Sequence, residues 1–376
     1  MSGGVDSSVT AALLERADFD VTGVFMKFWS EPDKNGLVGV GNRCCSPEAE
    51  VRARKVAKIL KIPFYVFNFE KEFKKRIVDY FLTAHKKGIT PNPCVVCNKE
   101  IKFGLLLEKA LTLSADFVAT GHYARLKNVG SETKLLKAKD KTKDQSYFLW
   151  ALSQKQLRRT LFPLGNYRKT QVRELAKELK LPFFSGLDRN KVPESQEICF
   201  VDDSIGEFLR RRIKLKPGKI INTRGEILGK HQGLPLYTIG QRKGIGLPGG
   251  PAFAKTVSFA EVASATKAES AGKPYYVLDK DIKKNFLVIS KNERDLYKKE
   301  LFLKEIHWIS NKSPRLPLKI KTKIRYRQPL VSAVLYPEQK TKGYKLVFRV
   351  SQRAVTPGQS AVFFKGREVL GGAIIK

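Results

Sequence analysis

The chain has 376 residues, which suggests two or three domains, and 42% of them are hydrophobic, enough for ordinary cores. Its net charge of +35 attracts polyanions such as nucleic acid or an anionic membrane surface, although a generally basic proteome would also produce such an excess. No run approaches the roughly 18 apolar residues of a membrane span, and no stretch resembles a signal peptide. Five cysteines, an odd number, do not suggest a disulfide framework, so we expect a protein of the reducing cytoplasm.

The first element in chain order is a glycine-rich loop that opens a helix. Residues 2–8 read SGGVDSS, and apolar residues at helical spacing follow. Glycine lets the backbone approach an anion, and the N–H groups and dipole of a helix start then bind it. A Gly-Gly turn with a serine cap would explain the same pattern without a ligand. Asp6 would repel a phosphate unless a cation lay between them, so we infer that Mg²⁺ accompanies the phosphate.

Short apolar strands then alternate with helices through the N-terminal half. We predict strands at 21–26, 63–68 and 116–121, and helices at 48–60 and 70–86. This alternation indicates a parallel sheet covered by helices. Nucleotides bind such sheets at the carboxyl ends of the strands, where Met26 and Gly121 lie.

A second dense motif, at 90–103, reads TPNPCVVCNKEIKF. Its prolines fix an extended entry, and we predict that a helix begins near Cys94 to Cys97. A thiol at a helix N-terminus beside Lys99 and Lys102 is expected to have a lowered pKa. Such a thiol suits a nucleophile or a metal ligand.

Three interpretations of the cysteines compete. Cys199, in ESQEICF, adds a third candidate to the two of the CxxC motif. The CxxC could be half of a structural zinc site completed by Cys44 and Cys45, although adjacent cysteines ligate one ion poorly. The cysteines could be inert core residues. Otherwise they carry out sulfur or iron–sulfur chemistry.

The pattern changes after Cys199. A short basic helix around 208–209 precedes a glycine-rich stretch with short strands at 218–280. From about 284 the chain reads as a small all-β barrel, with strands at 286–289, 319–326, 344–350 and 361–364. The segment 249–271 is rich in Ala, Ser and Gly, and we interpret it as a loop insertion.

Taken together, the motifs resemble the bacterial tRNA-specific 2-thiouridylases of the N-type ATP pyrophosphatase (PP-loop) superfamily. The resemblance covers essentially the whole chain and rests on SGGVDSS, PNPCVVCNKEIKFG, TGHYA (120–124), KDQSYFL (143–149), SQEICF (195–200), GQRKG (240–244), RYRQ (325–328) and TPGQ (356–359). It implies an α/β PP-loop N-terminal domain of the adenine nucleotide alpha hydrolase type, with a parallel sheet. It further implies a small, mainly β central domain and a C-terminal, tRNA-binding β-barrel. We place the three domains at 1–203, 204–281 and 282–376.

One departure from the family concerns the start of the chain. In the superfamily a buried strand precedes the glycine-rich loop, whereas this sequence begins at the loop itself. We therefore expect Met1 to be an internal residue of the natural protein and the central sheet to lack its first strand.

The family's reaction is ATP-dependent 2-thiolation of the wobble uridine in glutamate, lysine and glutamine tRNAs. The uridine O2 attacks the α-phosphate of ATP, which gives an adenylated base and pyrophosphate, and sulfur then displaces AMP. Mg²⁺ and the loop amides stabilise the charge that develops on phosphorus. The resemblance implies that ATP contacts Ser2, Gly3, Gly4, Val5, Asp6, Ser7, Ser8, Met26 and Gly121.

The resemblance assigns the sulfur chemistry to two cysteines. Cys199 would carry the incoming sulfur as a persulfide, and Cys97 would attack it as the nucleophile, forming a disulfide and releasing sulfide. Cys94 stands where some relatives have Asp. With Cys94, Cys97 and Cys199 as ligands, a [4Fe–4S] cluster with one open iron is an equally open alternative.

The resemblance also implies partners. The anticodon loop of tRNA would contact Asn92, Pro93, Cys94, His122, Lys143, Asp144, Gln145, Arg325, Tyr326 and Gln359. Arg325 and Tyr326 pair a phosphate-binding cation with a stacking ring, and the wobble base would flip out into the site. The sulfur donor would be a cysteine desulfurase or a sulfur-relay protein.

We expect a monomer without membrane association. Two rival functions are an amide-forming or ligase-type PP-loop ATP pyrophosphatase and a non-catalytic RNA-binding zinc protein.

Overall fold

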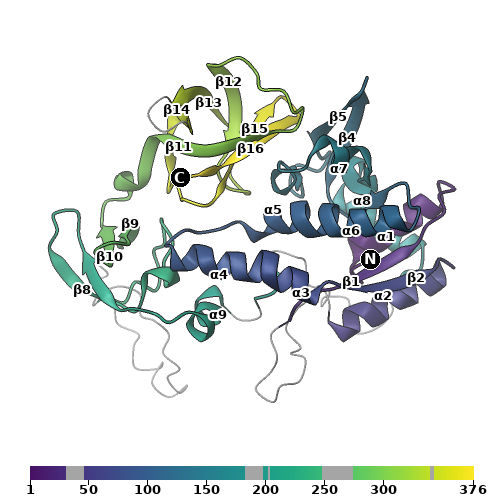
Figure 1. Cartoon of the computed structure of the whole chain (residues 1–376), viewed down its shortest axis with the longest axis horizontal. Helices are drawn as coiled ribbons and strands as arrows, with labels where there is room; N and C mark the ends of the chain where they lie inside the picture. The colour runs from purple at the N-terminus through teal and green to yellow at the C-terminus, as the bar shows by residue number, and fades with distance from the viewer. Residues whose placement is uncertain (31–45, 183–197, 202–203, 248–273, 339–342) are drawn as a thin grey trace.

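The computed structural model describes residues 1–30, 46–182, 198–201, 204–247, 274–338 and 343–376. Figure 1 shows an α/β region that holds the N-terminus, a barrel that holds the C-terminus, and a small β region beside both. The predicted insertion at 249–271 and the pair Cys44–Cys45 lie outside the described residues.

The N-terminal region contains two pairs of parallel strands, as the βαβ pattern predicts. β1 (Gly23–Lys27) pairs with β2 (Phe64–Asn68), and β3 (Val118–Ala119) pairs with β6 (Thr160–Leu161). Within the described residues these are two separate two-stranded sheets, and the expectation about a preceding strand stays a prediction. The elements around them are α1 (Val5–Glu15), α2 (Pro47–Ile59), η3 (Ser146–Phe148), α7 (Gln154–Arg158), η4 (Pro163–Asn166) and α8 (Lys169–Glu178).

The helix α2 shows how local sequence sets these elements. Ser46 caps it by accepting a hydrogen bond from the N–H of Ala49, and Pro47 occupies the first turn, where its missing N–H costs nothing. Small and branched apolar residues recur on one face and are fully buried: Ala49, Ala53, Val56 and Ala57.

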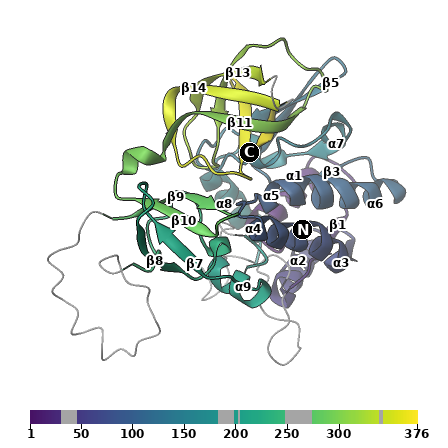
Figure 2. The same cartoon turned by 60° about the vertical axis from the view of Figure 1, so that its left-hand side comes forward.

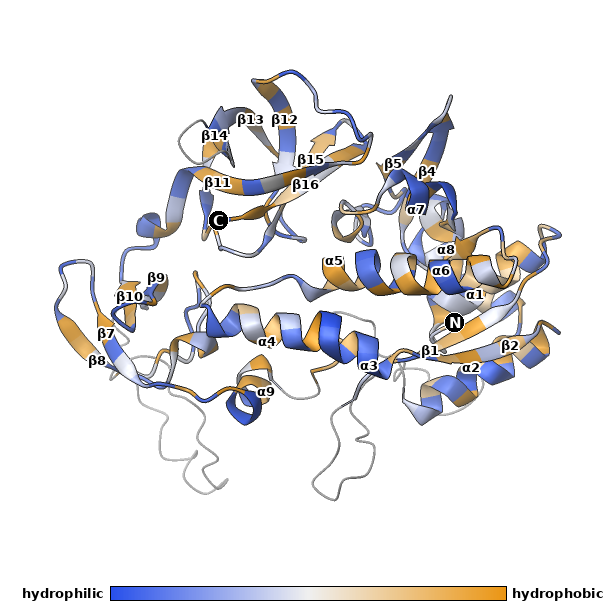
Figure 3. Cartoon of the chain, in the orientation of Figure 1, coloured by the Kyte–Doolittle hydropathy of each residue, from blue (hydrophilic) through white to orange (hydrophobic). Residues whose placement is uncertain are grey.

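Two long helical segments run side by side across the molecule (Figure 1). The first consists of α3 (Glu70–Phe73), the π-helical η1 (Lys74–Val78) and α4 (Asp79–Lys86); the second of α5 (Pro93–Cys97), the π-helical η2 (Asn98–Leu105) and α6 (Leu106–Thr112). The predicted helix at 70–86 is confirmed with this π-helical interruption. In Figure 3 apolar and polar residues alternate along both segments, as expected of helices with one buried face.

The central region is a four-stranded sheet in the order β8-β7-β10-β9. It contains α9 (Ile205–Arg212), β7 (Gly218–Ile221), β8 (Ile227–His231), η5 (Leu234–Leu236), β9 (Tyr276–Asp281) and β10 (Phe286–Ser290). The predicted domain boundary after residue 281 requires correction. β10 pairs with both β7 and β9, so the central sheet extends to residue 290.

The C-terminal region is a closed six-stranded barrel, as predicted. Its strands follow the order β11-β14-β13-β12-β15-β16, and β16 pairs back onto β11. Its elements are η6 (Glu293–Leu296), β11 (Tyr297–Trp308), β12 (Leu318–Lys323), β13 (Val331–Glu338), β14 (Gly343–Arg353), β15 (Ser360–Lys365) and β16 (Glu368–Ile375).

A hairpin of the N-terminal region extends this barrel sheet. β4 (Ala124–Val129) and β5 (Glu132–Lys137) pair with each other, and β5 pairs with β16. An ion pair of 3.1 Å between Lys134 and Glu368 supports the junction. Figure 2 shows β5 beside the barrel strands. The hairpin therefore ties the barrel to the α/β region. None of the described helices combines the length and apolar character that a bilayer crossing requires.

Candidate active site

A cavity of about 2900 Å³ lies between the α/β region and the barrel. Its wall includes the glycine-rich loop, the two strand ends, the three candidate cysteines and the barrel turn at 325–327. Of the site residues predicted from sequence, all except Gly3 and Ser8 line it. Segments that are far apart in the chain therefore face one common space.

The glycine-rich loop is built as an anion-binding helix start. Gly4 is the N-cap of α1 in an extended conformation and makes no side-chain cap, and the residues of the first turn line the cavity, where the N–H groups of a helix start can bind an anion. The hydroxyl of Ser7 lies 3.1 Å from that of Ser2 and also accepts the N–H of Ser2 at 3.1 Å, which closes the loop. Gly3 has a φ of +66°, and a Cβ there would overlap the carbonyl oxygen of Ala49. Only glycine satisfies both conditions.

Asp6 holds a cation that the sequence analysis did not find. Lys169 Nζ donates to both carboxylate oxygens of Asp6, at 2.7 and 2.8 Å, and the Tyr123 hydroxyl donates to one of them at 2.9 Å. Lys169 is the first residue of α8, 163 positions after Asp6. No motif marks it, because it stands in an ordinary amphipathic helix.

The two predicted strand-end residues lie at the same wall. Met26 is the next-to-last residue of β1 and lines the cavity. Gly121 follows β3 and packs on the start of α1, where a Cβ would come within 2.9 Å of the Asp6 carbonyl carbon and 3.0 Å of the Ser7 nitrogen. This close approach explains why a glycine stands there.

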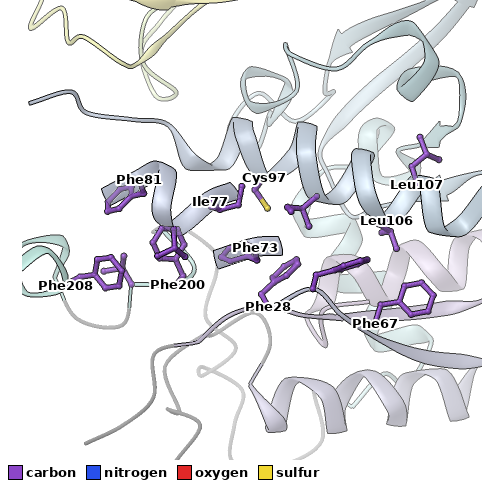
Figure 4. Close-up of a cluster of buried hydrophobic side chains, with 14 of the residues drawn as sticks. Phe28, Phe67, Phe73, Ile77, Phe81, Cys97, Leu106, Leu107, Phe200 and Phe208 are labelled. Carbon is purple, nitrogen blue, oxygen red and sulfur yellow. The ribbon is translucent and has the colours of Figure 1, made fainter. Parts of the chain in front are cut away.

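Cys97 and Cys199 share one apolar environment. We use the name phenylalanine cluster for its buried members around the cysteines, which are Phe28, Phe73, Ile77, Phe81, Cys97, Phe200 and Phe208. Cys97 is a buried member, 8% exposed, and the half-buried Cys199 packs against the cluster. Figure 4 shows the sulfur of Cys97 directed into it. Both residues also line the cavity, as does Cys94, and all three are reduced thiols.

The helix around the cysteines begins next to Cys94, at the near edge of the predicted range. It starts at Pro93, with Asn92 as the N-cap, and continues to residue 112. Cys94 therefore lies in the first turn, whereas Cys97 lies at the junction with the π-helical η2. The argument from a helix N-terminus applies to Cys94 and not to Cys97. π-helical turns inside α-helices are frequent at functional sites.

His122 is a neutral residue of the cavity wall. Its Nδ1 lies 2.8 Å from the Thr120 hydroxyl, and its ring packs between Phe103 and Phe162. Burial, and secondarily the charge of Lys102, hold the pKa of His122 well below its usual range. The imidazole can therefore donate or accept one hydrogen bond towards the cavity without carrying charge.

Residues 143–145 line the cavity, and two of them also accept hydrogen bonds from the backbone of neighbouring segments. The Asp144 carboxylate is buried and accepts the N–H groups of Ala138 and Ser146. The Gln145 side chain accepts the N–H of Tyr123 at 2.9 Å. These contacts give Asp144 and Gln145 structural roles that the sequence did not predict, and Gln145 positions the tyrosine that binds Asp6.

Two residues predicted to contact tRNA form hydrogen bonds that link separate regions of the molecule. Arg325 donates to the carbonyls of Ile239 and Ala354 and to the Thr356 hydroxyl, at 2.8–3.2 Å. Gln359 donates to the carbonyls of Thr90 and Pro91, at 3.0 and 3.1 Å, in the segment that leads to Asn92 and Pro93. The barrel thereby fixes the entry to the cysteine helix.

Tyr326 fits its predicted stacking role better. Its ring lies 4.5 Å from that of Phe148, centroid to centroid, and both line the cavity. Basic side chains outnumber acidic ones along the wall: Lys102, Lys109, Lys141, Lys143, Lys169, Arg173, Lys177, Lys323, Arg325 and Arg327 against Asp6, Asp20, Asp116 and Asp144. An anionic ligand is therefore favoured.

Comparison with known proteins agrees with this geometry. Residues 1–203 match the model of the tRNA methyl transferase HUP domain, 206–291 the tRNA methyl transferase PRC-barrel domain and 298–375 the aminomethyltransferase beta-barrel domain. The tRNA-specific 2-thiouridylase MnmA of Halothermothrix orenii is 44% identical over 380 residues, covering 100% of this chain and 97% of the relative. This chain belongs to the tRNA-specific 2-thiouridylase family.

Further relatives support the same family. The tRNA-specific 2-thiouridylase MnmA 2 of Thermoanaerobacter sp. is 43% identical over 382 residues, and the MnmA of Clostridioides difficile is 42% identical over 381. Each alignment covers 100% of this chain and 96% of the relative. The resemblance inferred from the motifs is confirmed.

Membership of this PP-loop family implies the use of ATP and Mg²⁺, and the loop fits both. The amides of α1, the serine hydroxyls and Lys169 offer donors to a polyphosphate. The Asp6 carboxylate already accepts three hydrogen bonds from Lys169 and Tyr123, of about four that it can accept. A Mg²⁺ ion here would therefore depend mainly on phosphate oxygens and water, as is usual for this ion.

An iron–sulfur cluster does not fit the described site. Among the described residues no three His, Cys, Asp or Glu side chains are arranged to hold a metal ion, so Cys94, Cys97 and Cys199 do not form the required ligand set. The sulfur of Cys97 points into the phenylalanine cluster instead (Figure 4).

Proposed function

We propose that this chain catalyses ATP-dependent 2-thiolation of the wobble uridine in the tRNAs for glutamate, lysine and glutamine. One observation carries the proposal: the anion-binding loop and the two cysteines Cys97 and Cys199 line the same cavity. The names of the family relatives, each a tRNA-specific 2-thiouridylase, support the substrate and the reaction.

The first step activates the base. The uridine O2 attacks the α-phosphorus of ATP, the bond to the β-phosphate breaks, and pyrophosphate leaves with the electron pair. The base then carries an O2–AMP group, which leaves far more easily than a carbonyl oxygen. The first turn of α1 and Lys169 line the cavity, where the helix amides and the ammonium would offset the charge that develops on the phosphates.

The second step delivers sulfur. Cys199 carries a persulfide, and the Cys97 thiolate attacks the inner sulfur, so that a Cys97–Cys199 disulfide forms and hydrosulfide leaves. Hydrosulfide adds to C2 of the adenylated base and AMP departs. A thiol reductant then supplies two electrons to restore both thiols. A cysteine desulfurase or a sulfur-relay protein would reload Cys199.

The shared apolar environment supports this pairing of thiols. Cys97 belongs to the phenylalanine cluster and Cys199 packs against it. An apolar surrounding excludes water, which would otherwise compete with hydrosulfide for the activated base.

The cavity wall supports binding of an unstacked anticodon base. Tyr326 and Phe148 offer aromatic surface, and the surrounding lysines and arginines offer charge to the RNA backbone. His122, held neutral, can hydrogen-bond to a base edge.

The decisive experiment follows tRNA nucleosides by mass spectrometry. Unmodified glutamate tRNA is incubated with purified protein, ATP, Mg²⁺, a persulfide donor and a thiol reductant. We expect 2-thiouridine at the wobble position, and none in a tRNA whose wobble base is cytidine. Absence of 2-thiouridine, or pyrophosphate release with a carboxylic acid or amine substrate instead, would favour a ligase-type relative.

A second measurement separates persulfide from cluster chemistry. The protein is purified without oxygen, and its iron, acid-labile sulfide and visible absorption are measured. Thiolation by protein without iron supports the persulfide route. Activity that depends on about four irons per chain would contradict it. One bound zinc per chain without nucleotide turnover would instead support a non-catalytic RNA-binding protein.

A further inference from the structure

Cys94 is the cavity cysteine that has no step in the proposed sulfur transfer. It is half-buried and lines the cavity, as Cys97 and Cys199 do, and all three are reduced thiols. Cys94 and Cys97 both belong to α5 and stand three positions apart. A third thiol beside a pair that is oxidised in every cycle can take part in disulfide exchange with that pair.

The spacing of Cys94 and Cys97 permits a disulfide between them. A rise of about 1.5 Å per residue and about 3.6 residues per turn place Cα atoms three positions apart in a helix at about 5 Å. Disulfides join Cα atoms that are about 4.4–6.8 Å apart. Cys94 also lies in the first turn of a helical segment that continues to residue 112, where the partial positive charge of the helix start favours a thiolate.

Burial makes a bond between Cys97 and Cys199 hard to reach from outside. Cys97 is 8% exposed, and its sulfur is directed into the phenylalanine cluster, against which Cys199 also packs (Figure 4). A thiolate must approach a disulfide sulfur directly in order to break the bond. Cys94 is half-buried and lies outside the cluster, so its sulfur is the more accessible one to a reductant in the cavity.

We propose that Cys94 is a resolving thiol that regenerates Cys199 after each sulfur transfer. The inference rests on the proposed function, which forms the Cys97–Cys199 disulfide. The Cys94 thiolate attacks the Cys97 sulfur, a Cys94–Cys97 bond forms, and the Cys97–Cys199 bond breaks. Cys199 leaves with the electron pair and takes up a proton. An external dithiol then supplies two electrons and two protons to the Cys94–Cys97 disulfide.

The exchange separates two tasks that would otherwise compete for the same bond. Once Cys199 is a thiol again, it can accept new sulfur while the Cys94–Cys97 disulfide still awaits its reductant. The reductant meets the disulfide at the cavity wall instead of inside the phenylalanine cluster. Relatives with Asp in place of Cys94 would need direct reduction of the Cys97–Cys199 bond.

The first test maps disulfides by mass spectrometry without ATP or tRNA. The purified protein is equilibrated in a glutathione redox buffer, quenched with acid and alkylated. The Cys94–Cys97 bond should exceed the Cys97–Cys199 bond at least about tenfold, with Cys199 alkylated. In Cys94→Ser the bond should join Cys97 and Cys199. Val96→Ala changes a half-buried residue of the same helix, keeps all three thiols and should reproduce the unmodified pattern. Circular dichroism verifies that each variant is folded.

The second test compares two reductants during repeated turnover. With a dithiol protein of the thioredoxin class as the only reductant, Cys94→Ser should lose at least about tenfold more 2-thiouridine formation than with an excess of a small dithiol, which can enter the buried site. Equal losses with the two reductants, or a Cys97–Cys199 bond that predominates in the unmodified protein, would overturn the proposal. The expected disulfide pattern without any 2-thiouridine would refute the proposed function and leave the exchange between the thiols standing.

Discussion

The two ends of the cavity differ in polarity. The nucleotide end is a polar network in which Asp6, Lys169 and Tyr123 are joined by hydrogen bonds of 2.7–2.9 Å. The sulfur end is the phenylalanine cluster, in which Cys97 is buried among aromatic rings. Each end suits its half of the reaction that we propose, because there charge would be stabilised at phosphorus whereas water would be kept from sulfur.

This difference implies that substitutions at the two ends should have different effects on ligand binding and on stability. Polar networks act through the position of a few atoms, so a single change should alter binding and leave folding intact. Apolar clusters act through packing, so a change there should cost stability and alter the exposure of the thiols. The four predictions below test this separation.

The largest effect is expected at the sulfur end from Cys199→Ser. A serine cannot carry a persulfide, so 2-thiouridine formation should fall by at least about 1,000-fold, as for loss of an essential nucleophile. ATP affinity should not change, because the nucleotide end is untouched. Nucleoside mass spectrometry and calorimetry measure the two quantities.

Cys94→Ser is the matched control. Cys94 lines the same cavity but is not a member of the phenylalanine cluster. In the persulfide route it should retain activity within about tenfold, which corresponds to a rise of at most about 1.4 kcal/mol in the activation barrier. Equal loss in the two variants would point to a three-cysteine site.

The second prediction concerns the loop backbone. Gly3→Ala places a side chain at a φ of +66° and against the Ala49 carbonyl, so the loop must shift. Such strain costs about 1–3 kcal/mol, and we expect ATP affinity to fall about 10- to 100-fold. Gly4→Ala has ordinary space, with the Ser2 hydroxyl 3.5 Å from the new Cβ, and should bind ATP nearly normally. Equal effects of the two changes would show that the strain at Gly3 is not what matters.

How much of this could be read from the sequence depends on how local each feature is. The glycine-rich loop, α2 and the cysteine motif are continuous in the chain, so their patterns predicted them. Lys169 was missed because its partner is 163 positions away and a lysine at a helix start is unremarkable in a chain with 71 basic residues.

Side-chain roles in the barrel were missed for a related reason. The sequence shows that Arg325 and Gln359 are polar, but not where their donors point. In the structure both bind backbone carbonyls across region boundaries. The hairpin β4–β5 was also missed, because its lysine-rich strands do not resemble the edge of a barrel that begins some 160 residues later. Such long-range pairing has no local signal.

The third prediction returns to the apolar end. Phe200 is 2% exposed and contacts the rings of Phe73, Phe81 and Phe208 at 5.4–5.8 Å. Phe200→Ala should lower the free energy of unfolding by about 3–5 kcal/mol and speed alkylation of the neighbouring Cys199. ATP affinity measured well below the melting temperature should stay unchanged.

Phe302→Ala serves as the control for that change. Phe302 is 41% exposed on the barrel, so its removal should alter stability by no more than about 0.5 kcal/mol. If Phe200→Ala weakened ATP binding as strongly as it destabilised the fold, the two ends of the cavity would not be separable.

The smallest effect concerns the titratable side chain that stacks on the apolar end. His85 packs on Phe81, with ring centroids 4.5 Å apart, and its Nδ1 donates to the Pro235 carbonyl at 3.2 Å. Burial lowers the pKa of His85 to about 4, the charge of Lys280 acts in the same direction, and the hydrogen bond opposes both. In the unfolded chain His85 takes up a proton near pH 6.5, whereas the folded protein resists it until about pH 4.

The contribution of neutral His85 to the free energy of unfolding is therefore fully present above pH 6.5 and is lost as the pH falls towards 4. Between pH 7 and pH 5 the loss should reach about 2 kcal/mol. His85→Gln keeps a donor for Pro235 and removes the titration, so its urea-unfolding midpoint should fall less over this range than that of the unmodified protein. Because the nucleotide end lies apart from His85, ATP affinity should depend on pH equally in both proteins. A steeper pH dependence of stability in the glutamine variant would mean that His85 is protonated in the folded state and that the aromatic cluster tolerates charge.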